Sequence, residues 1–194
     1  MKRYILAITG ASGSIFGIRL LKEIASSNHV YLVVSRSALP IIRDETGLDL
    51  RSDPLSVIKE HTSSDNIDVF DDDNLYAPIA SGSFENDGMF IAPCTMKTLS
   101  AVAAGGSSNL IERAADVIIK ESRKLVLCPR EMPFSPIHLE NMLKLSRIGV
   151  SIAPPVPAFY NRPGSIDDMI DFVVGKLLDC MNIKNDLYNR WGGD

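Results

Sequence analysis

The stretch Tyr4-Ile-Leu-Ala-Ile-Thr-Gly-Ala-Ser-Gly-Ser-Ile-Phe-Gly-Ile-Arg-Leu20 decides how this chain folds. Its first five residues are apolar and predict a buried parallel strand. The small residues of Thr9–Gly13 break that strand and let the backbone approach a ligand closely. A helix follows, and its N-terminal N–H groups and dipole face the end of the strand. This unit predicts a site for an anion, in particular a phosphate; a tight turn with nothing bound is the alternative.

Apolar runs and helical patterns alternate along the rest of the chain. Further strands are expected at 29–34, 67–70, 88–93, 124–128 and 150–153. Helices are expected to follow capping residues at Ser35, Asp53, Thr95, Asn109, Ser135 and Ser165. This alternation predicts an α/β protein with a doubly wound, mostly parallel sheet, that is, a Rossmann-like or flavodoxin-like three-layer sandwich. We expect one domain over residues 1–194, with the tail 182–194 contributing to a site or to a subunit contact.

Composition and charge exclude several classes of protein. The 194 residues carry a net charge of −4 with both signs mixed, which argues against nucleic-acid binding. No run approaches the roughly 20 apolar residues of a membrane span, and the N-terminus lacks the pattern of a signal peptide. The odd number of cysteines, with no CxxC pair, suits a reducing cytoplasm. We expect Cys94 and Cys128 to be buried apolar residues and the three scattered histidines to bind no metal.

The glycine pattern disfavours a nicotinamide dinucleotide. Gly10, Gly13 and Gly17 do not follow the G-x-G-x-x-G spacing. The strand 29–34 is followed by Ser35, where such sites place an acidic residue for the ribose. Arg36 leaves an NADP 2′-phosphate open as an alternative.

Polar residues also follow the later strands. The turn Thr95–Thr98 can hydrogen-bond an anion or a ring edge, and Arg130 and Glu131 form a charged pair bracketed by prolines, which restrict the backbone. We favour a ligand-binding role for this pair over a structural ion pair. Arg113 and Lys120 lie seven residues apart on one helix face, where a solvated stripe is the alternative. The residues thus predict an anionic, phosphorylated and planar ligand across several strand ends.

Six motifs occur in this chain in one order: Thr9-Gly10-Ala11-Ser12-Gly13, Ser81-Gly82-Ser83, Asn109-Leu110-Ile111-Glu112-Arg113-Ala114-Ala115-Asp116, Pro129-Arg130-Glu131, Pro154-Pro155-Val156-Pro157-Ala158-Phe159-Tyr160 and Arg190-Trp191-Gly192. Together they resemble the UbiX-type flavin prenyltransferase family over essentially the full length. The resemblance implies an enzyme that joins a dimethylallyl group from dimethylallyl phosphate to N5 and C6 of reduced FMN without a metal. It also implies a UbiD-type decarboxylase as functional partner. Members form homo-oligomers, often dodecamers, with sites between subunits.

The resemblance assigns roles to residues by motif. For FMN it implies Gly10, Ala11, Ser12, Ser35, Thr95, Met96, Lys97, Thr98 and Arg130. For dimethylallyl phosphate it implies Tyr160, Lys176, Arg113, Lys120, Glu45 and Trp191. For catalysis it implies Glu131, Ser12, Arg113, Lys120 and Tyr160. Glu131 matches the acid/base residue, and the cations would stabilise the leaving phosphate.

One position departs from the family pattern. Lys176 stands where members typically carry Arg on the last helix, which keeps the charge and loses bidentate recognition of phosphate.

Two other function classes remain as alternatives. A related group of flavin-dependent decarboxylases acts on phosphopantothenoyl or peptidyl cysteine and typically uses a catalytic His near the first helix. Here the nearby histidine is His29, at the start of the second strand. A non-catalytic FMN carrier is the third class, and it would give Arg130, Glu131 and Tyr160 no purpose.

Overall fold

The computed structural model describes residues 1–192, which build on a six-stranded sheet of parallel strands in the order β3-β2-β1-β4-β5-β6. The strands are β1 (Arg3–Ile8), β2 (His29–Val34), β3 (Ile67–Asp71), β4 (Gly88–Cys94), β5 (Leu125–Pro129) and β6 (Ser151–Ile152). The helices are α1 (Ser14–Ala25), α2 (Ala38–Thr46), α3 (Pro54–Thr62), the short 3-10 turn η1 (Pro78–Ala80), α4 (Met96–Ala103), α5 (Leu110–Lys120), α6 (Pro136–Arg147) and α7 (Ile166–Cys180). The predicted fold class is confirmed.

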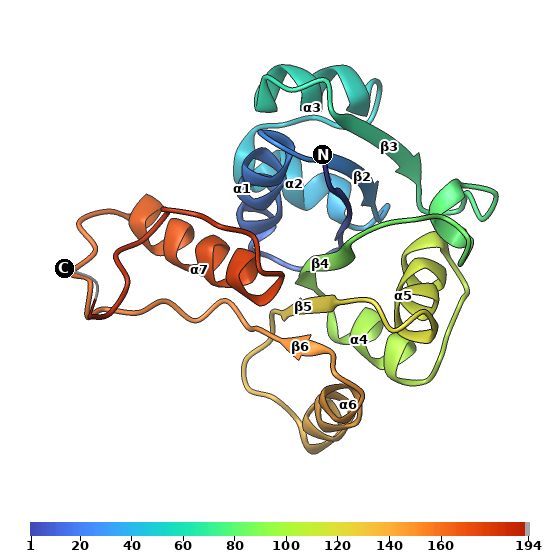
Figure 1. Ribbon diagram of the computed structural model, residues 1–194. Coiled ribbons are helices and arrows are strands. Elements are labelled where there is room, and N and C mark those ends of the chain that lie inside the picture. The colour runs from blue at the N-terminus through green and yellow to red at the C-terminus, as the bar shows by residue number, and fades with distance from the viewer. Residues whose placement is uncertain (193–194) are drawn as a thin grey trace.

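Apolar side chains cover both faces of the sheet. Along β1, Tyr4, Leu6 and Ile8 belong to one buried cluster, whereas Ile5 and Ala7 belong to the other, because successive side chains of a strand point to opposite faces. The first cluster packs under α1, α2, α3 and α7, and the second under α4 and α5. Figure 1 shows α1 and α7 on one side of the sheet and α4 and α5 on the other. The near-continuous apolar runs in the sequence follow from this burial on both faces.

The strand order reverses between β1 and β4. The chain winds outward from β1 to β2 and β3, and then returns to the other side of β1 through β4, β5 and β6. At such a switch point the connecting loops diverge to opposite faces, which leaves a crevice at the carboxyl ends of the two strands. The residues after β1 and β4, namely Thr9–Gly13 and Thr95–Thr98, therefore face the same crevice.

Helix capping follows the sequence in most places. Asp53, Thr95, Asn109, Ser135 and Ser165 each accept a hydrogen bond from a backbone N–H in the first turn of the following helix.

Two local predictions were wrong. Ser35 does not cap α2: the N-cap is Ser37, two residues later, and Ser35 Oγ lies 3.1 Å from Ser37 Oγ. The last strand spans two residues, because only Ser151 and Ile152 pair with β5 at the sheet edge.

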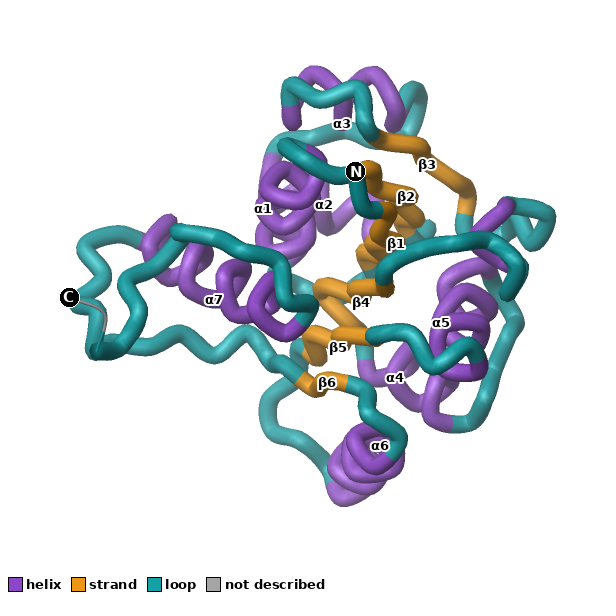
Figure 2. The backbone as a smooth tube through the Cα atoms, in the orientation of Figure 1, coloured by secondary structure: helices purple, strands orange, loops and turns teal. Residues whose placement is uncertain are grey.

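The loop after β6, helix α7 and the tail after it form an arm beside the sheet. Figure 2 shows the loop running outward along α7 and the tail returning along the same helix. Arg19 on α1 holds the helix through Asp171, at 2.9 Å. The predicted domain of residues 1–194 reaches Gly193 and Asp194, which lie outside the described residues. Within residues 1–192, no helix has the length and apolar character needed to cross a membrane.

Candidate functional site

Hydrogen bonds join the carboxyl ends of β1 and β4. Thr9 Oγ1 donates to the carbonyl oxygen of Pro93 at 2.8 Å and accepts from the backbone N–H of Thr95 at 2.9 Å. Thr9 is buried, so these bonds fix the two turns relative to each other at the strand switch. The floor of the crevice is therefore rigid.

The N-terminus of α1 binds a carboxylate from within the chain. Glu45 on α2 accepts hydrogen bonds from the backbone N–H groups of Gly13 and Ser14 at 3.0 and 2.8 Å, and from Ser14 Oγ at 2.7 Å. Burial raises the pKa of Glu45, but hydrogen bonds from Ser12, Ser14 and the backbone together lower it below its usual value. This end of α1 is where the sequence predicts a phosphate, and the structure places the Glu45 carboxylate there.

A cradle lies on the other side of the turn. A cavity of about 460 Å³ opens at the switch point, and it is lined by Thr9, Gly10, Ser35, Arg36, Ser37, Asp72, Thr95, Lys97, Thr98, Asn109, Ile111 and Glu112. The N-terminal ends of α2, α4 and α5 all border it, through Ser37, Thr95 and Asn109. Helix N-termini, hydroxyl groups and the Lys97 ammonium favour a phosphate here.

Gly10 is required by close packing within this cradle. A Cβ at this position would lie 2.7 Å from Ser37 Cβ and would overlap Ser37 Oγ. The neighbouring Ala11 is buried, and its N–H donates to the carbonyl oxygen of Thr9 at 2.8 Å. Met96, the first residue of α4, packs on the core beneath the cradle.

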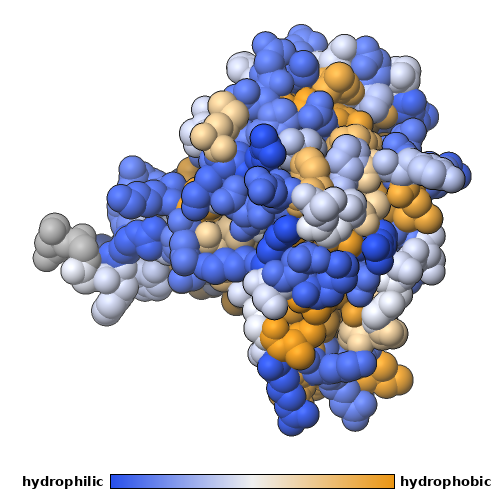
Figure 3. Space-filling view, turned by 45° about the vertical axis from the view of Figure 1, so that its right-hand side comes forward, coloured by the Kyte–Doolittle hydropathy of each residue, from blue (hydrophilic) through white to orange (hydrophobic). Residues whose placement is uncertain are grey.

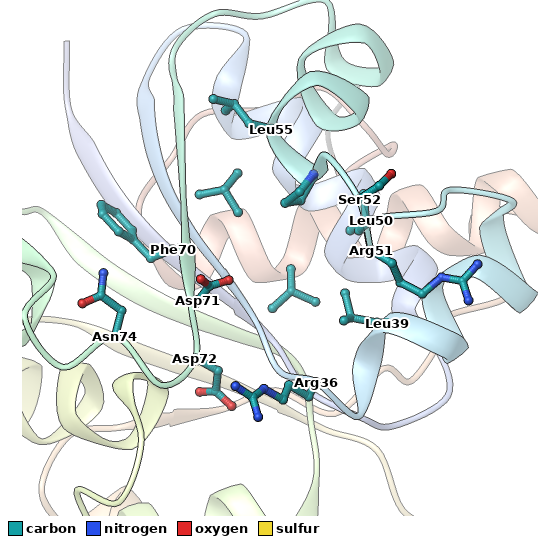
Figure 4. Close-up of a pocket in the computed structure, with 13 residues that line it drawn as sticks. Arg36, Leu39, Leu50, Arg51, Ser52, Leu55, Phe70, Asp71, Asp72 and Asn74 are labelled. Carbon is teal, nitrogen blue, oxygen red and sulfur yellow. The ribbon is translucent and has the colours of Figure 1, made fainter.

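Asp72 and Arg36 line both the cradle and a neighbouring cavity of about 510 Å³, which lies between the ends of β2 and β3 and the start of α3. Figure 4 shows this neighbouring cavity. Asp72 Oδ1 is buried and has no hydrogen-bond partner among the described residues. Burial, followed by the nearby Glu112 and Asp73, raises the pKa of Asp72. An unused buried carboxyl oxygen at a cradle wall is suited to accept a hydrogen bond from a ligand hydroxyl.

The loop after β5 reaches the first turn from the other side. Arg130 Nε donates to the carbonyl oxygen of Ser12 at 3.1 Å, and the backbone N–H of Arg130 donates to the carbonyl oxygen of Cys94. Arg130 and Glu131 also line a cavity of about 440 Å³ with Met132, Phe134, Val156 and the prolines 129, 133, 154 and 155. The charged pair therefore stands between the turn that follows β1 and an apolar cavity.

Three of the six residues expected to bind dimethylallyl phosphate, namely Tyr160, Lys176 and Trp191, lie on the arm. Tyr160 meets Trp191 edge to face, with ring centroids 5.4 Å apart, and meets Phe172 of α7 in the same way at 6.0 Å. Lys176 follows Phe172 by four residues and shares its helix face. Tyr160 is 45% exposed and Trp191 is 81% exposed. The arm thus presents two aromatic rings and a cation to its surroundings.

Arg113 and Lys120 lie elsewhere in the chain. Arg113 donates to the carbonyl oxygen of Ala80 and to Asp116, both at 3.1 Å, and Lys120 pairs with Glu121 beside Gly82. Both belong to α5, on the opposite face of the sheet from the arm (Figure 1).

The expected site residues therefore form three groups in one chain. The edge group comprises Gly10, Ala11, Ser12, Ser35, Glu45, Thr95, Met96, Lys97, Thr98, Arg130 and Glu131. The arm group comprises Tyr160, Lys176 and Trp191, and the α5 group comprises Arg113 and Lys120. Within residues 1–192, no hydrogen bond or ion pair links one group to another.

Of the twelve residues that line the cradle, the sequence assigned Gly10, Ser35, Thr95, Lys97 and Thr98 to the FMN site. Ser37 and Asp72 are among those it did not assign. Ser37 lies two residues after Ser35 in the turn that follows β2. Its place at the carboxyl end of a parallel strand could have marked it as a site residue. Asp72 lies in the acidic run after β3, and such a run is more often a solvated loop.

The expected roles of Cys94 and Cys128 are confirmed. Both side chains are fully buried, and burial raises the pKa of each thiol, to about 12 for Cys128. This burial fits small apolar residues of the core and not accessible nucleophiles.

Comparisons with known proteins show the family of this chain. The model of the family described as Flavoprotein matches residues 1–178. Flavin prenyltransferase UbiX of Methanocaldococcus jannaschii is 47% identical over 190 residues, which cover 98% of each chain. The mitochondrial flavin prenyltransferase PAD1 of Saccharomyces cerevisiae is 46% identical, over 99% of this chain and 76% of its own length.

Solved structures give the same result. AnUbiX (PadA1), in complex with FMN and dimethylallyl pyrophosphate, superposes with a TM-score of 0.90 at 42% identity, covering 99% of this chain and 98% of its own. A dodecameric FMN-dependent UbiX-like decarboxylase from Escherichia coli O157:H7 also gives 0.90 at 42% identity, covering 98% and 100%. A phosphopantothenoylcysteine (PPC) decarboxylase, at 19% identity and a TM-score of 0.61, shares the fold alone. The chain therefore belongs to the flavoprotein family and, within it, to the UbiX-type flavin prenyltransferases.

Proposed function

We propose that this protein joins the dimethylallyl group of dimethylallyl phosphate to N5 and C6 of reduced FMN, which gives prenylated FMN. The observation that carries the proposal is the contact between Arg130 and Ser12, because it brings the phosphate cradle and the apolar cavity at Glu131 to one edge of the sheet. The UbiX-type relatives named above support the same reaction.

The cradle fits the flavin mononucleotide. Its hydroxyl groups, the Lys97 ammonium and the N-terminus of α4 suit the phosphate, and the unused Asp72 oxygen suits a hydroxyl of the ribityl chain. Glu45 already neutralises the N-terminus of α1, so the phosphate does not occupy this helix end. Gly10, Ala11 and Ser12 then border the flavin ring. When bound, reduced FMN supplies the nucleophilic ring atoms.

The residues of the chain supply the remaining chemistry. Arg113, Lys120 and Lys176 stabilise the charge that the phosphate gains as the carbon–oxygen bond breaks. The faces of Tyr160 and Trp191 stabilise the positive charge that develops on the allyl group. Glu131, beside an apolar cavity, accepts the proton that must leave before the new ring is complete.

A homo-oligomer explains why these residues are divided within one chain. The arm group and the α5 group lie on opposite faces of the sheet, so the α5 group of one subunit would complete the site of another. Large apolar side chains on α6 and beyond it are exposed, namely Ile137, Leu139, Leu143 and Ile148, and Figure 3 shows apolar atoms on the lower surface. The Escherichia coli relative is described as dodecameric, and we propose the same assembly here.

Two further assignments follow from the proposed reaction. Prenylated FMN is a cofactor that another enzyme must consume, and we propose a UbiD-type decarboxylase as that partner. We also propose a cytoplasmic location, which agrees with three free cysteines, two of them buried.

The cysteine decarboxylase alternative is less well supported. Its catalytic histidine would have to lie near α1 at the carboxyl edge of the sheet. His29, at the start of β2, lies at the opposite edge, where its Nε2 is 2.8 Å from Asp68 Oδ2.

Mass spectrometry of the released flavin tests the proposal. After anaerobic incubation with reduced FMN and dimethylallyl phosphate, we expect the flavin to gain one C5H8 unit. The Glu131→Gln variant should bind FMN normally and form product about a hundredfold more slowly, since general acid–base groups contribute on this scale. Glu140→Gln, an exposed carboxylate on α6, is the matched control. Unmodified FMN from the wild-type protein would refute the transferase assignment, and normal product from Glu131→Gln would refute the role of Glu131.

A further inference from the structure

The tail that carries Trp191 is fastened to α7 through one carboxylate. Asp179 lies in the last turn of α7, and the Arg190 guanidinium donates to both of its oxygens, at 2.8 Å from Nη2 to Oδ1 and 3.0 Å from Nη1 to Oδ2. Two parallel hydrogen bonds fix the orientation of the guanidinium as well as its distance from the carboxylate. Arg190 directly precedes Trp191, so the contact sets where the indole side chain begins.

Two more donors converge on the same carboxylate. Tyr188 Oη donates to Asp179 Oδ2 at 2.5 Å, and Asn185 Nδ2 donates to Oδ1 at 3.0 Å. Burial raises the pKa of Asp179, but the hydrogen bonds from Arg190 and Tyr188 lower it overall, so the group is ionised at neutral pH. We call Asp179, Asn185, Tyr188 and Arg190 the Asp179 clasp.

Packing fixes the register of the tail along the helix. The Tyr188 ring lies so close to Gly175 that a Cβ there would be 2.5 Å from Tyr188 Cδ1. Tyr188 also meets Phe172 with ring centroids 5.0 Å apart, and the Arg190 guanidinium carbon lies 5.2 Å from the centroid of the Tyr188 ring. The clasp and the ring packing therefore hold the tail at one position on α7.

Trp191 depends on this anchoring. Its side chain is 81% exposed, and the aromatic partner it meets is Tyr160, at 5.4 Å between centroids. A ring with so little burial gains little free energy from its own packing. The clasp, one residue away, is the firm attachment that keeps the indole beside Tyr160.

We propose that Asp179 is a positioning residue for the prenyl-donor side of the site: it clasps the tail so that Trp191 stands against Tyr160. The inference rests on the proposed function, which assigns Tyr160 and Trp191 to the allyl group. Asp179 itself touches neither ring and acts through Arg190 and Tyr188.

The first test follows Trp191 directly, because it is the single tryptophan of the chain. Time-resolved fluorescence anisotropy of the full-length protein, before flavin is added, should show a restricted indole. Asp179→Asn should increase the amplitude of the fast nanosecond component at least twofold. Arg190→Ala removes the other partner of this ion pair, on the exposed tail, and should give the same result. It serves as the test if the Asp179→Asn variant on the helix folds poorly. Asp186→Asn, another carboxylate of the tail, is the matched control and should resemble the wild type.

The second test measures the reaction. In Asp179→Asn the kcat/KM for dimethylallyl phosphate should fall about tenfold, because misplacing Trp191 removes stabilisation of the charge that develops on the allyl group, while the Kd for FMN stays unchanged. Combining Asp179→Asn with Arg190→Ala should add little to either single change, because both remove one pair.

The outcomes distinguish a failure of the clasp from a failure of the proposed function. Unchanged anisotropy in both variants would overturn the clasp, and freed Trp191 with an unchanged kcat/KM would overturn its positioning role. A wild-type protein that forms no prenylated flavin would refute the proposed function, and the anisotropy comparison would still decide whether the clasp exists.

Discussion

At the residue scale, Gly10 and Ser37 make one close contact in the phosphate cradle. Gly10→Ala would force Ser37 to move, and overpacking of this kind costs about 1–3 kcal/mol, so the Kd for FMN should rise about tenfold or more. Adding Ser37→Gly should recover much of the loss, and Ser37→Gly alone measures the contribution of that hydroxyl. Gly164→Ala, where a Cβ would meet Asp168 at an ordinary 3.6 Å, is the control. Equal FMN affinity in Gly10→Ala and wild type would argue against the cradle.

Glu45 predicts a defined dependence of stability on pH. Its pKa is lowered in the folded protein, so its contribution is complete above the unfolded value of 4.5 and is lost as the pH falls below it through the folded pKa. Glu45→Gln should lower the free energy of unfolding by about 1 kcal/mol at pH 7, as for other helix N-terminal caps. Urea unfolding at fixed protein concentration measures this, with Glu140→Gln as the control. The difference should shrink below pH 4.5; a difference that persists there would contradict the account.

At the element scale, we propose that the N-terminus of α4 takes the phosphate-binding role that the sequence assigned to α1. Lys97 is the second residue of α4 and lines the cradle. Lys97→Gln should weaken FMN binding about tenfold, since a hydrogen bond to a charged group contributes about 1.5–3 kcal/mol, and should leave riboflavin binding unchanged. Fluorescence titration with both flavins provides the comparison, and Lys144→Gln on α6 is the control. Equal weakening for both flavins would place Lys97 at the ring and not at the phosphate.

The elements were predictable because their signals are local. Apolar runs mark the strands, and Asp53, Asn109 and Ser165 mark helix starts through hydrogen bonds that span three residues. The occupant of the α1 N-terminus was not predictable in this way, because Glu45 lies 31 residues beyond Ser14 and reaches it only after α2 packs beside α1. The tail shows the same limit: its sequence does not reveal that Arg190 returns to Asp179.

At the scale of the whole molecule, we propose that the three groups of expected site residues meet in a site shared between subunits. Under this arrangement each active site takes Arg113 from one subunit and Tyr160 from another. Arg113→Ala and Tyr160→Ala should therefore each inactivate the enzyme. Co-expression of the two variants in equal amounts should then restore activity, because some sites combine two intact contributions. For a site built from two subunits, random assembly of a symmetric oligomer gives about a quarter of wild-type activity.

A second pair of variants makes the complementation test decisive. Arg130→Ala and Glu131→Gln both alter the edge group, and neighbouring residues of one chain contribute to the same site. Every site in that mixed assembly carries one defect, so co-expression should restore no activity. The measurement is the yield of prenylated FMN per subunit, with assembly checked by sedimentation. If Arg113→Ala and Tyr160→Ala also failed to complement in assembled oligomers, Arg113 would serve the site of its own chain or none, and its bonds to Ala80 and Asp116 would be its structural role.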